Sequence, residues 1–148
     1  MSLIDALQED MKQALKARDE LRLSTIRLLR SSVSYARIEK GEELTDDEVL
    51  DVISRAAKQR RESIDAAERV DRSDIADKEK AELEILQTYL PEPLDESEVE
   101  AMAREIAEAV GAKDPKDRGK IMGPLMQKIR GRADGKLANS VVEKILRG

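Results

Sequence analysis

The chain of 148 residues contains no cysteine and no histidine, and its only aromatic residues are Tyr35 and Tyr89. Without cysteine there is no disulfide, thiolate nucleophile or thiolate metal ligand, and without histidine the usual general base and the commonest transition-metal ligand are missing. The sequence has no apolar run of about 18 residues, and its first residues include acids where a signal peptide carries a basic region. These absences predict a cytoplasmic protein with no membrane association and no metal.

The residues that are present favour helices. Hydrophobic residues make up 40% of the chain and charged residues another 40%, and the hydrophobic set is mostly Leu, Ile, Val, Ala and Met. Such an aliphatic set suits helices better than strands, and no apolar alternation of period two persists anywhere. The sequence therefore predicts an all-α protein.

Capping residues mark the ends of several predicted helices. Ser2, Thr45 and Asp95 can each begin a helix, because their side chains accept a hydrogen bond from a backbone N–H of the first turn. Gly41 and Gly111 can end two helices, because glycine adopts the left-handed conformation. Apolar residues recur at helical spacing between these ends. In the fourth predicted helix Ile75, Leu83, Leu86 and Leu90 lie on one side.

Two prolines divide the predicted helices into two groups. Pro91 and Pro93 follow the fourth helix, and neither they nor the residues before them can continue it. We predict an acidic N-terminal helical bundle over residues 1–93. A small domain of three helices is expected over residues 94–148, with the sixth helix beginning at Asp114-Pro115.

Charge is distributed unevenly along the chain. The net charge is −5, but residues 113–148 hold ten Lys and Arg against four Asp and Glu, a balance of +6, so the rest of the chain carries −11. Seven of these basic residues and four of the seven glycines lie between Lys116 and Lys136. A concentrated basic segment with small residues indicates a docking surface for a polyanion.

The candidate site residues come from this segment. The cations expected to contact phosphates of RNA are Lys120, Lys128, Arg130, Arg132 and Lys136, and the accompanying glycines are Gly119, Gly123 and Gly131. Gly119 and Gly123 share one helix face, where they permit either close helix packing or close approach of a phosphate backbone. Gly131 is expected to end the helix. Neither tyrosine lies in the segment, so recognition of shape and backbone is expected rather than stacking of bases.

Two other basic clusters allow two interpretations each. Arg22, Arg27, Arg30 and Arg37 occupy the second predicted helix without an acid from Leu21 to Ile38, and Arg55, Lys58, Arg60 and Arg61 lie in the third. Each cluster either pairs with acids of the bundle or extends a polyanion surface, and we favour pairing for both.

No self-sufficient active site is predicted. Gly119-Lys120 lacks the glycine five residues earlier that a phosphate-binding loop requires, and Ile121 stands where Ser or Thr would bind magnesium. Ser31-Ser32 lies inside a helical pattern without a glycine-rich loop for an oxyanion hole. No catalytic residue and no cofactor are therefore expected.

Two segments resemble a known family. Residues 58–94 and 117–137, together with the capped helices around them, resemble the GatB/YqeY family of small bacterial proteins. The second segment is similar to the tail domain of the GatB subunit of the glutamyl/aspartyl-tRNA amidotransferase. The residues that match the tail pattern are Gly119-Lys120, Met122, Met126, Lys128 and Gly131-Arg132-Ala133-Asp134.

The resemblance implies a fold and a function. The fold would be a YqeY-type N-terminal helical bundle with a small amidotransferase-tail-like domain of three helices. The function would be binding of tRNA or another structured RNA, without DNA binding and without a catalytic site. One alternative is an accessory component of a carbon-nitrogen ligase with glutamine as amido-N-donor, with an amidotransferase or an aminoacyl-tRNA synthetase as partner. A second alternative is a protein-protein adaptor.

Overall fold

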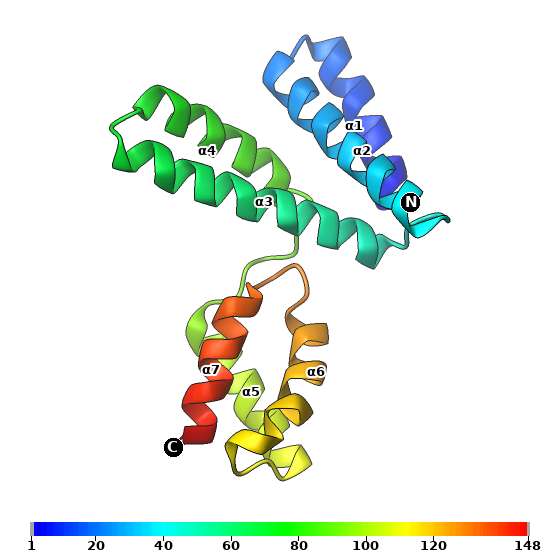
Figure 1. The fold of residues 1–148 in the computed structure, drawn as a ribbon. Coiled ribbons are helices and arrows are strands. Elements are labelled where there is room, and N and C mark those ends of the chain that lie inside the picture. The colour runs from blue at the N-terminus through cyan, green and yellow to red at the C-terminus, as the bar shows by residue number, and fades with distance from the viewer. Residues whose placement is uncertain (1, 148) are drawn as a thin grey trace. The chain divides into compact units, whose positions relative to one another are not determined.

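The computed structural model describes residues 2–147, which form seven α-helices and one short 3-10 helix without any strand (Figure 1). The prediction of an all-α protein is confirmed. Contacts divide the chain into two compact units, Met1–Leu90 and Pro91–Gly148. That each unit is a domain able to fold by itself stays a prediction, as does the boundary that the sequence places after residue 93.

Unit 1 consists of two helical hairpins. The helices are α1 (Leu3–Ala17), α2 (Glu20–Lys40), α3 (Asp46–Arg69) and α4 (Ser73–Gln87). Helices α1 and α2 run antiparallel, and so do α3 and α4 (Figure 1). Their shared aliphatic core contains Leu7, Leu29, Val33, Val49, Ile53, Ala57 and Leu86.

The capping residues act as their sequence positions predict. Ser2 accepts the Asp5 backbone N–H at 3.2 Å, and both Thr45 and Asp95 form reciprocal capping boxes at the starts of α3 and α5. Gly41 ends α2 in the left-handed conformation with a φ of 83°. Local sequence therefore sets these helix ends, because a cap depends on residues within one turn.

Three of the four apolar residues grouped on one side of the fourth predicted helix face the core, since Leu86 is buried and Leu83 and Leu90 pack against this core, but Ile75 does not. Ile75 is 41% exposed, whereas its neighbour Ala76 is 2% exposed and buried. The face that turns inward also carries Glu79 and Glu82, both of which lie against Arg60 of α3. The apolar pattern alone groups Ile75 with the core residues, because it does not show that the acids Glu79 and Glu82 lie on the inward face.

Arg60 forms a half-buried ion cluster between α3 and α4. Its Nε lies 2.7 Å from Glu82 Oε2, with which it forms a hydrogen bond, and 3.3 Å from Glu79 Oε2, which it meets as an ion pair without hydrogen-bond geometry. Glu82 is 8% exposed, so its charge requires this partner. The interpretation of Arg60 as a pairing residue within the bundle is thereby supported.

Tyr89 joins the two hairpins. It follows α4, and its hydroxyl donates a hydrogen bond of 2.5 Å to Asp10 Oδ2 of α1. Burial and this hydrogen bond raise the pKa of the Tyr89 phenol well above its usual value. Arg22 of α2 lies 3.7 Å from the other Asp10 oxygen, so three elements meet at one carboxylate.

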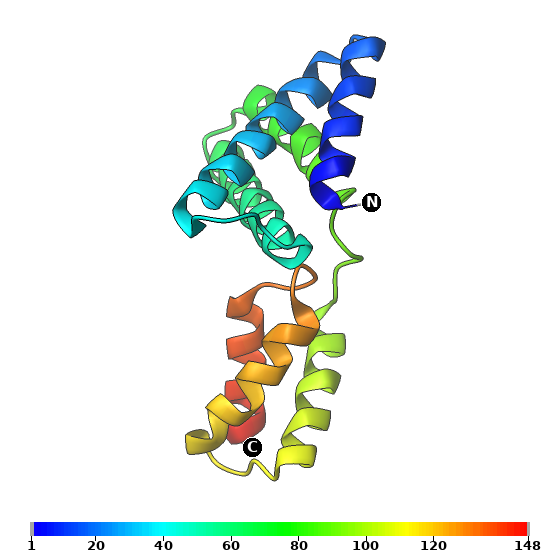
Figure 2. The same cartoon turned by 90° about the vertical axis from the view of Figure 1, so that its right-hand side faces the viewer.

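Unit 2 is a bundle of three α-helices, seen from two sides in Figures 1 and 2. The elements are α5 (Glu96–Val110), η1 (Pro115–Asp117), α6 (Arg118–Ile129) and α7 (Gly135–Arg147). Asp114 caps η1 through a capping box with Asp117, and η1 leads directly into α6, so helical structure begins at Asp114-Pro115 as predicted and becomes α-helical at Arg118. The buried core contains Leu94, Val99, Ala103, Ile106, Ala107, Ile121, Leu125, Ile129, Ala138, Val141, Val142 and Leu146.

The first prediction concerns Tyr89. Tyr89→Phe removes the hydroxyl that reaches Asp10, and we expect the free energy of unfolding to fall by about 1 kcal/mol, as for a hydrogen bond to a charged acceptor at a half-buried site. Urea denaturation followed by circular dichroism measures this change. Tyr35→Phe is the matched control, because Tyr35 is 68% exposed and its change should have little effect. Equal losses in both variants would contradict the role assigned to the Tyr89 hydroxyl.

The second prediction concerns unit 2 alone. A fragment of residues 91–148 should unfold cooperatively on heating, although a chain of this size buries only about 60% of its unfolded surface and should be only marginally stable. A fragment of residues 95–148 should be less stable by about 2 kcal/mol, because it lacks the buried Leu94 side chain. Calorimetry of both fragments tests this expectation. A fragment 91–148 without a cooperative transition would show that unit 2 needs the rest of the chain.

Candidate nucleic-acid interface

The buried residues of α6 determine which of its faces is open. Ile121, Leu125 and Ile129 are each 0% exposed and recur every four positions, so they form one row against α5 and α7. Because residues four apart lie on the same side of a helix, the rows on the opposite side face solvent.

Two such open rows lie next to each other on α6. The first row contains Gly119, Gly123 and Gln127, and the second contains Lys120, Pro124 and Lys128; all six residues are exposed. Eight residues separate Lys120 from Lys128, which corresponds to about 12 Å along the helix axis. On the open side of α6, one row therefore lacks side chains at Gly119 and Gly123. The row beside it holds Lys120 and Lys128.

The glycines of this row are not explained by packing within the chain. Apart from its chain neighbours and the backbone of its own helix, a Cβ built on Gly119 or on Gly123 would meet no atom of residues 2–147 within 4 Å. The interpretation as close helix packing therefore has no support among the described residues. Gly123 has a separate steric reason, because a residue with a Cβ is disfavoured in a helix before proline. Gly119 has no such reason, and a glycine inside a helix costs roughly 0.5–1 kcal/mol relative to alanine.

The two lysines of the second row have different surroundings. Lys120 Nζ lies 3.3 Å from Asp117 Oδ1, an exposed ion pair of little energetic weight. The Lys113 backbone amide and then the Lys120 side chain lower the pKa of Asp117. Within residues 2–147, the Lys128 ammonium forms no ion pair. Lys128 is therefore the more available of the two cations.

The other predicted cations lie in the loop after α6 and at the start of α7, and Arg132 has a structural role there. Gly131 adopts a φ of 74°, the left-handed conformation in which glycine is unstrained, so the chain turns there. Arg132 Nε then donates a hydrogen bond of 3.0 Å to the Glu92 carbonyl, and the Arg132 carbonyl accepts the Leu94 N–H at 2.8 Å. Arg132 thus fastens the segment that leads into α5.

Acids accompany the cations of this loop. Because Leu94 is bonded to Arg132, the α5 capping residue Asp95 lies one residue from the loop. Asp134 accepts the Lys136 backbone N–H at 3.2 Å, at the start of α7. The eight predicted residues therefore fall into two groups. Gly119, Lys120, Gly123 and Lys128 lie on the open side of α6, and Arg130, Gly131, Arg132 and Lys136 lie in or beside a loop that also contains acids.

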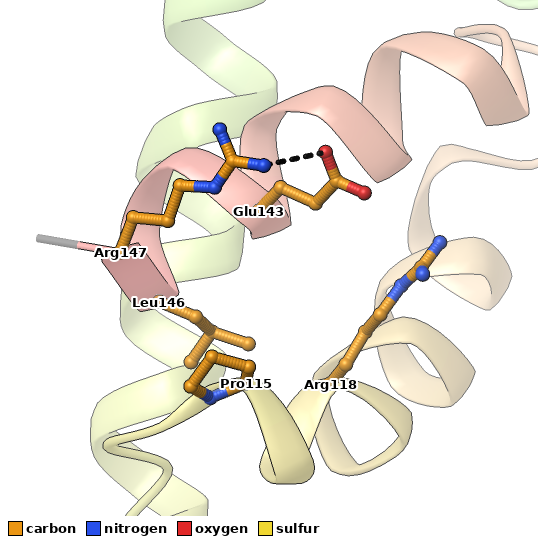
Figure 3. Close-up of a pocket in the computed structure, with 5 residues that line it drawn as sticks. All are labelled: Pro115, Arg118, Glu143, Leu146 and Arg147. Atoms are coloured by element: carbon orange, nitrogen blue, oxygen red, sulfur yellow. Dashed lines mark ion pairs between the residues drawn. The ribbon is translucent and has the colours of Figure 1, made fainter.

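A surface hollow of about 300 Å³ lies near the corner between α5 and α6, at Pro115, Arg118, Glu143, Leu146 and Arg147 (Figure 3). Figure 3 shows Arg118 on one side and Arg147 on the other, with Arg147 paired to Glu143 at 4.0 Å. Arg118 also donates a hydrogen bond to Asn139. Sequence reasoning did not select these residues, since α6 and α7 bring them together only in the fold.

Two other kinds of site have no support among the described residues. Within residues 2–147, no helix is sufficiently long and apolar to cross a membrane. The acids of the same range do not form a group of three that could hold a metal ion.

Comparison with known proteins finds relatives in fungi. Three relatives are each named altered inheritance of mitochondria protein 41, mitochondrial. The protein of Pyrenophora tritici-repentis is 26% identical over 97% of this chain and 81% of its own length. Those of Lachancea thermotolerans and Vanderwaltozyma polyspora are 35% and 33% identical over 66% and 75% of this chain. The matches span 53% and 64% of those two proteins.

The names of these relatives correct one prediction. The sequence predicted a cytoplasmic protein, whereas all three relatives are named as mitochondrial. The prediction of a cytoplasmic location is therefore wrong. It rested on the absence of targeting features in the composition and first residues, which is weak evidence for a location.

The family of the chain follows from a match along nearly its whole length. The profile of the YqeY family, described as Yqey-like protein, matches residues 4–146 and so includes both helical units. The part of the resemblance that concerns YqeY is thereby confirmed. This chain belongs to the family of YqeY-like proteins.

Proposed function

We propose that unit 2 binds the phosphate backbone of structured RNA, with tRNA as the first candidate, and that the open side of α6 is its contact surface. The observation that carries the proposal is the exposed position of Gly119 on α6. This glycine exposes helix backbone to solvent beside the Lys120 and Lys128 row, and no packing among residues 2–147 requires it. Cations next to an uncovered backbone suit the close approach of a phosphate chain.

The chemistry of unit 2 supports backbone contacts rather than base reading. Both tyrosines precede residue 91, so unit 2 has no aromatic ring on which a base could stack. Its charged residues give the C-terminal segment 113–148 a balance of +6 in a protein of net charge −5. Contacts of this kind recognise shape and charge with little dependence on base sequence.

The choice of tRNA and the wider role rest on the resemblance to the amidotransferase tail. That resemblance also suggests an accessory role beside a carbon-nitrogen ligase with glutamine as amido-N-donor. RNA binding at α6 is the first step that such a role would need. It can be measured without knowing the partner enzyme.

The third prediction tests the lysine row. Lys120→Ala combined with Lys128→Ala should weaken binding of unfractionated tRNA and reduce the slope of log affinity against log salt by about two, because two phosphate contacts are lost. Filter-binding titrations of the full chain at several salt concentrations give this slope.

The matched control removes two lysines from unit 1. Lys12→Ala combined with Lys16→Ala also deletes two exposed cations four residues apart on α1, and it should leave the slope unchanged. If both double variants reduce the slope equally, net charge rather than the α6 surface governs binding. Unchanged binding by the Lys120 and Lys128 variant would remove α6 from the proposal.

The fourth prediction separates stability from binding at Gly119. Gly119→Ala should raise the free energy of unfolding by about 0.5–1 kcal/mol, because alanine favours the helix and its Cβ meets no atom. The same methyl group should weaken tRNA binding several-fold, because it would keep a phosphate chain from the α6 backbone. Thermal denaturation and filter binding measure the two effects. A variant that is more stable and binds equally well would show that nothing approaches this position closely.

A further inference from the structure

Helix α2 carries a stripe of large apolar residues and serines that is exposed except at Leu21, which is half-buried. The stripe consists of Leu21, Ser24, Leu28, Ser31, Tyr35 and Ile38. Leu28 is 58% exposed, Tyr35 is 68% exposed and Ile38 is 72% exposed. Another side of the same helix packs into unit 1, and there Ile26, Leu29 and Val33 are buried. The exposed stripe is therefore additional to what the bundle needs.

The spacing of this stripe is that of a helix partner. Its members are separated by three, four, three, four and three residues, which is the heptad pattern of positions that interlock with a second helix. The larger side chains alternate with serines up to Tyr35, so each serine leaves room for a side chain of the partner. Ser32 and Ser34 lie beside the stripe and add no bulk. An arrangement of large and small residues in this register suits close packing of one more helix.

The charge around the stripe indicates the kind of helix. No acid lies between Leu21 and Ile38, and most of the four arginines in this span have partners within the bundle. Arg22 lies 3.7 Å from Asp10, Arg37 lies 3.2 Å from Glu43, and Arg30 donates to the Met11 sulfur. The interpretation that these arginines pair within the bundle is therefore supported for two of them.

Arg27 is the exception. It is exposed, it directly precedes Leu28 of the stripe, and it forms no ion pair within residues 2–147. A second copy of this chain would place Arg27 against a span that also holds no acid from residue 21 to residue 38, so it would leave this charge without a partner. A partner helix with acidic flanks instead supplies the missing charge.

We propose that the stripe from Leu21 to Ile38 is a docking site for an acidic amphipathic helix of another protein. Leucine-sized side chains of the partner fill the spaces over Ser24 and Ser31, and an acid beside its apolar seam pairs with Arg27. This site lies in unit 1 and is independent of RNA binding by α6.

The test uses a synthetic probe and the full chain. The probe is a fluorescein-labelled helical peptide of four heptads, with Leu at the two seam positions and Glu at the flanking positions, kept below the concentration at which it self-associates. Fluorescence anisotropy at about 0.15 M salt, where only nearby charges act, should show saturable binding. A peptide with Lys in place of Glu should bind at least about tenfold more weakly.

Variants of the stripe locate the binding surface. Leu28→Ser with Tyr35→Ser should weaken binding of the Glu peptide at least about tenfold, as expected when two central anchors are truncated. Leu15→Ser is the matched control, because Leu15 of α1 is also 58% exposed but lies outside the stripe. Arg27→Glu should reverse the preference between the two peptides, whereas Lys12→Glu should leave it unchanged. Both stripe variants should retain helical circular dichroism and tRNA affinity.

Several outcomes would overturn the proposal. Equal affinity for the Glu and Lys peptides would remove the role of charge, and equal loss from Leu15→Ser would show that any exposed leucine suffices. Sedimentation velocity that gives a dimer of the wild-type chain, and a monomer of the Leu28 and Tyr35 variant, would assign the stripe to a second copy. The affinity for tRNA is measured on the same proteins. A failure of the peptide-docking proposal is therefore distinguishable from a failure of the RNA-binding function proposed for α6.

Discussion

The structure depends first on the packing of aliphatic side chains. With no aromatic residue other than Tyr35 and Tyr89, the two cores are built from Leu, Ile, Val and Ala on helices. In unit 2 each helix uses one stripe of these residues, and the α6 stripe ends at Ile129 with 0% exposure. The side of α6 away from that stripe has no structural task, so glycines and lysines can occupy it. The candidate interface follows from this division between a packed face and an open one.

A few polar contacts decide how the aliphatic helices are arranged. Tyr89 reaches Asp10 across 79 positions of the sequence, and Arg60 reaches Glu82 across 22. Arg132 holds the Glu92 carbonyl at the start of unit 2. Aliphatic packing is not directional, whereas each of these bonds has a preferred geometry, so they constrain how the segments that they join are placed. Arg132 shows that a residue in a basic segment can serve the fold and still lie close to the proposed binding surface.

Features set by neighbouring residues could be predicted from the sequence, and features set across the fold could not. Helix ends at Ser2, Thr45 and Gly41 follow from caps within one turn, and the all-α class follows from aliphatic periodicity. In the fourth predicted helix the apolar pattern located Leu83, Leu86 and Leu90 but not the exposure of Ile75, because the inward side also holds Glu82, which is buried with Arg60 of another helix. For the candidate site, the sequence located the basic segment. It could not show that Arg132 bonds to Glu92, or that no atom approaches Gly119.

The central claim is that RNA contacts the open side of α6. An NMR titration of the nitrogen-15-labelled chain with unfractionated tRNA tests it most directly, because glycine amides are well separated in such spectra. The account predicts that the amide signals of Gly119, Lys120 and Gly123 shift or broaden first, with Lys128 following, while signals of α3 and α4 stay in place. Changes that begin in unit 1, or an unchanged spectrum at saturating tRNA, would contradict it.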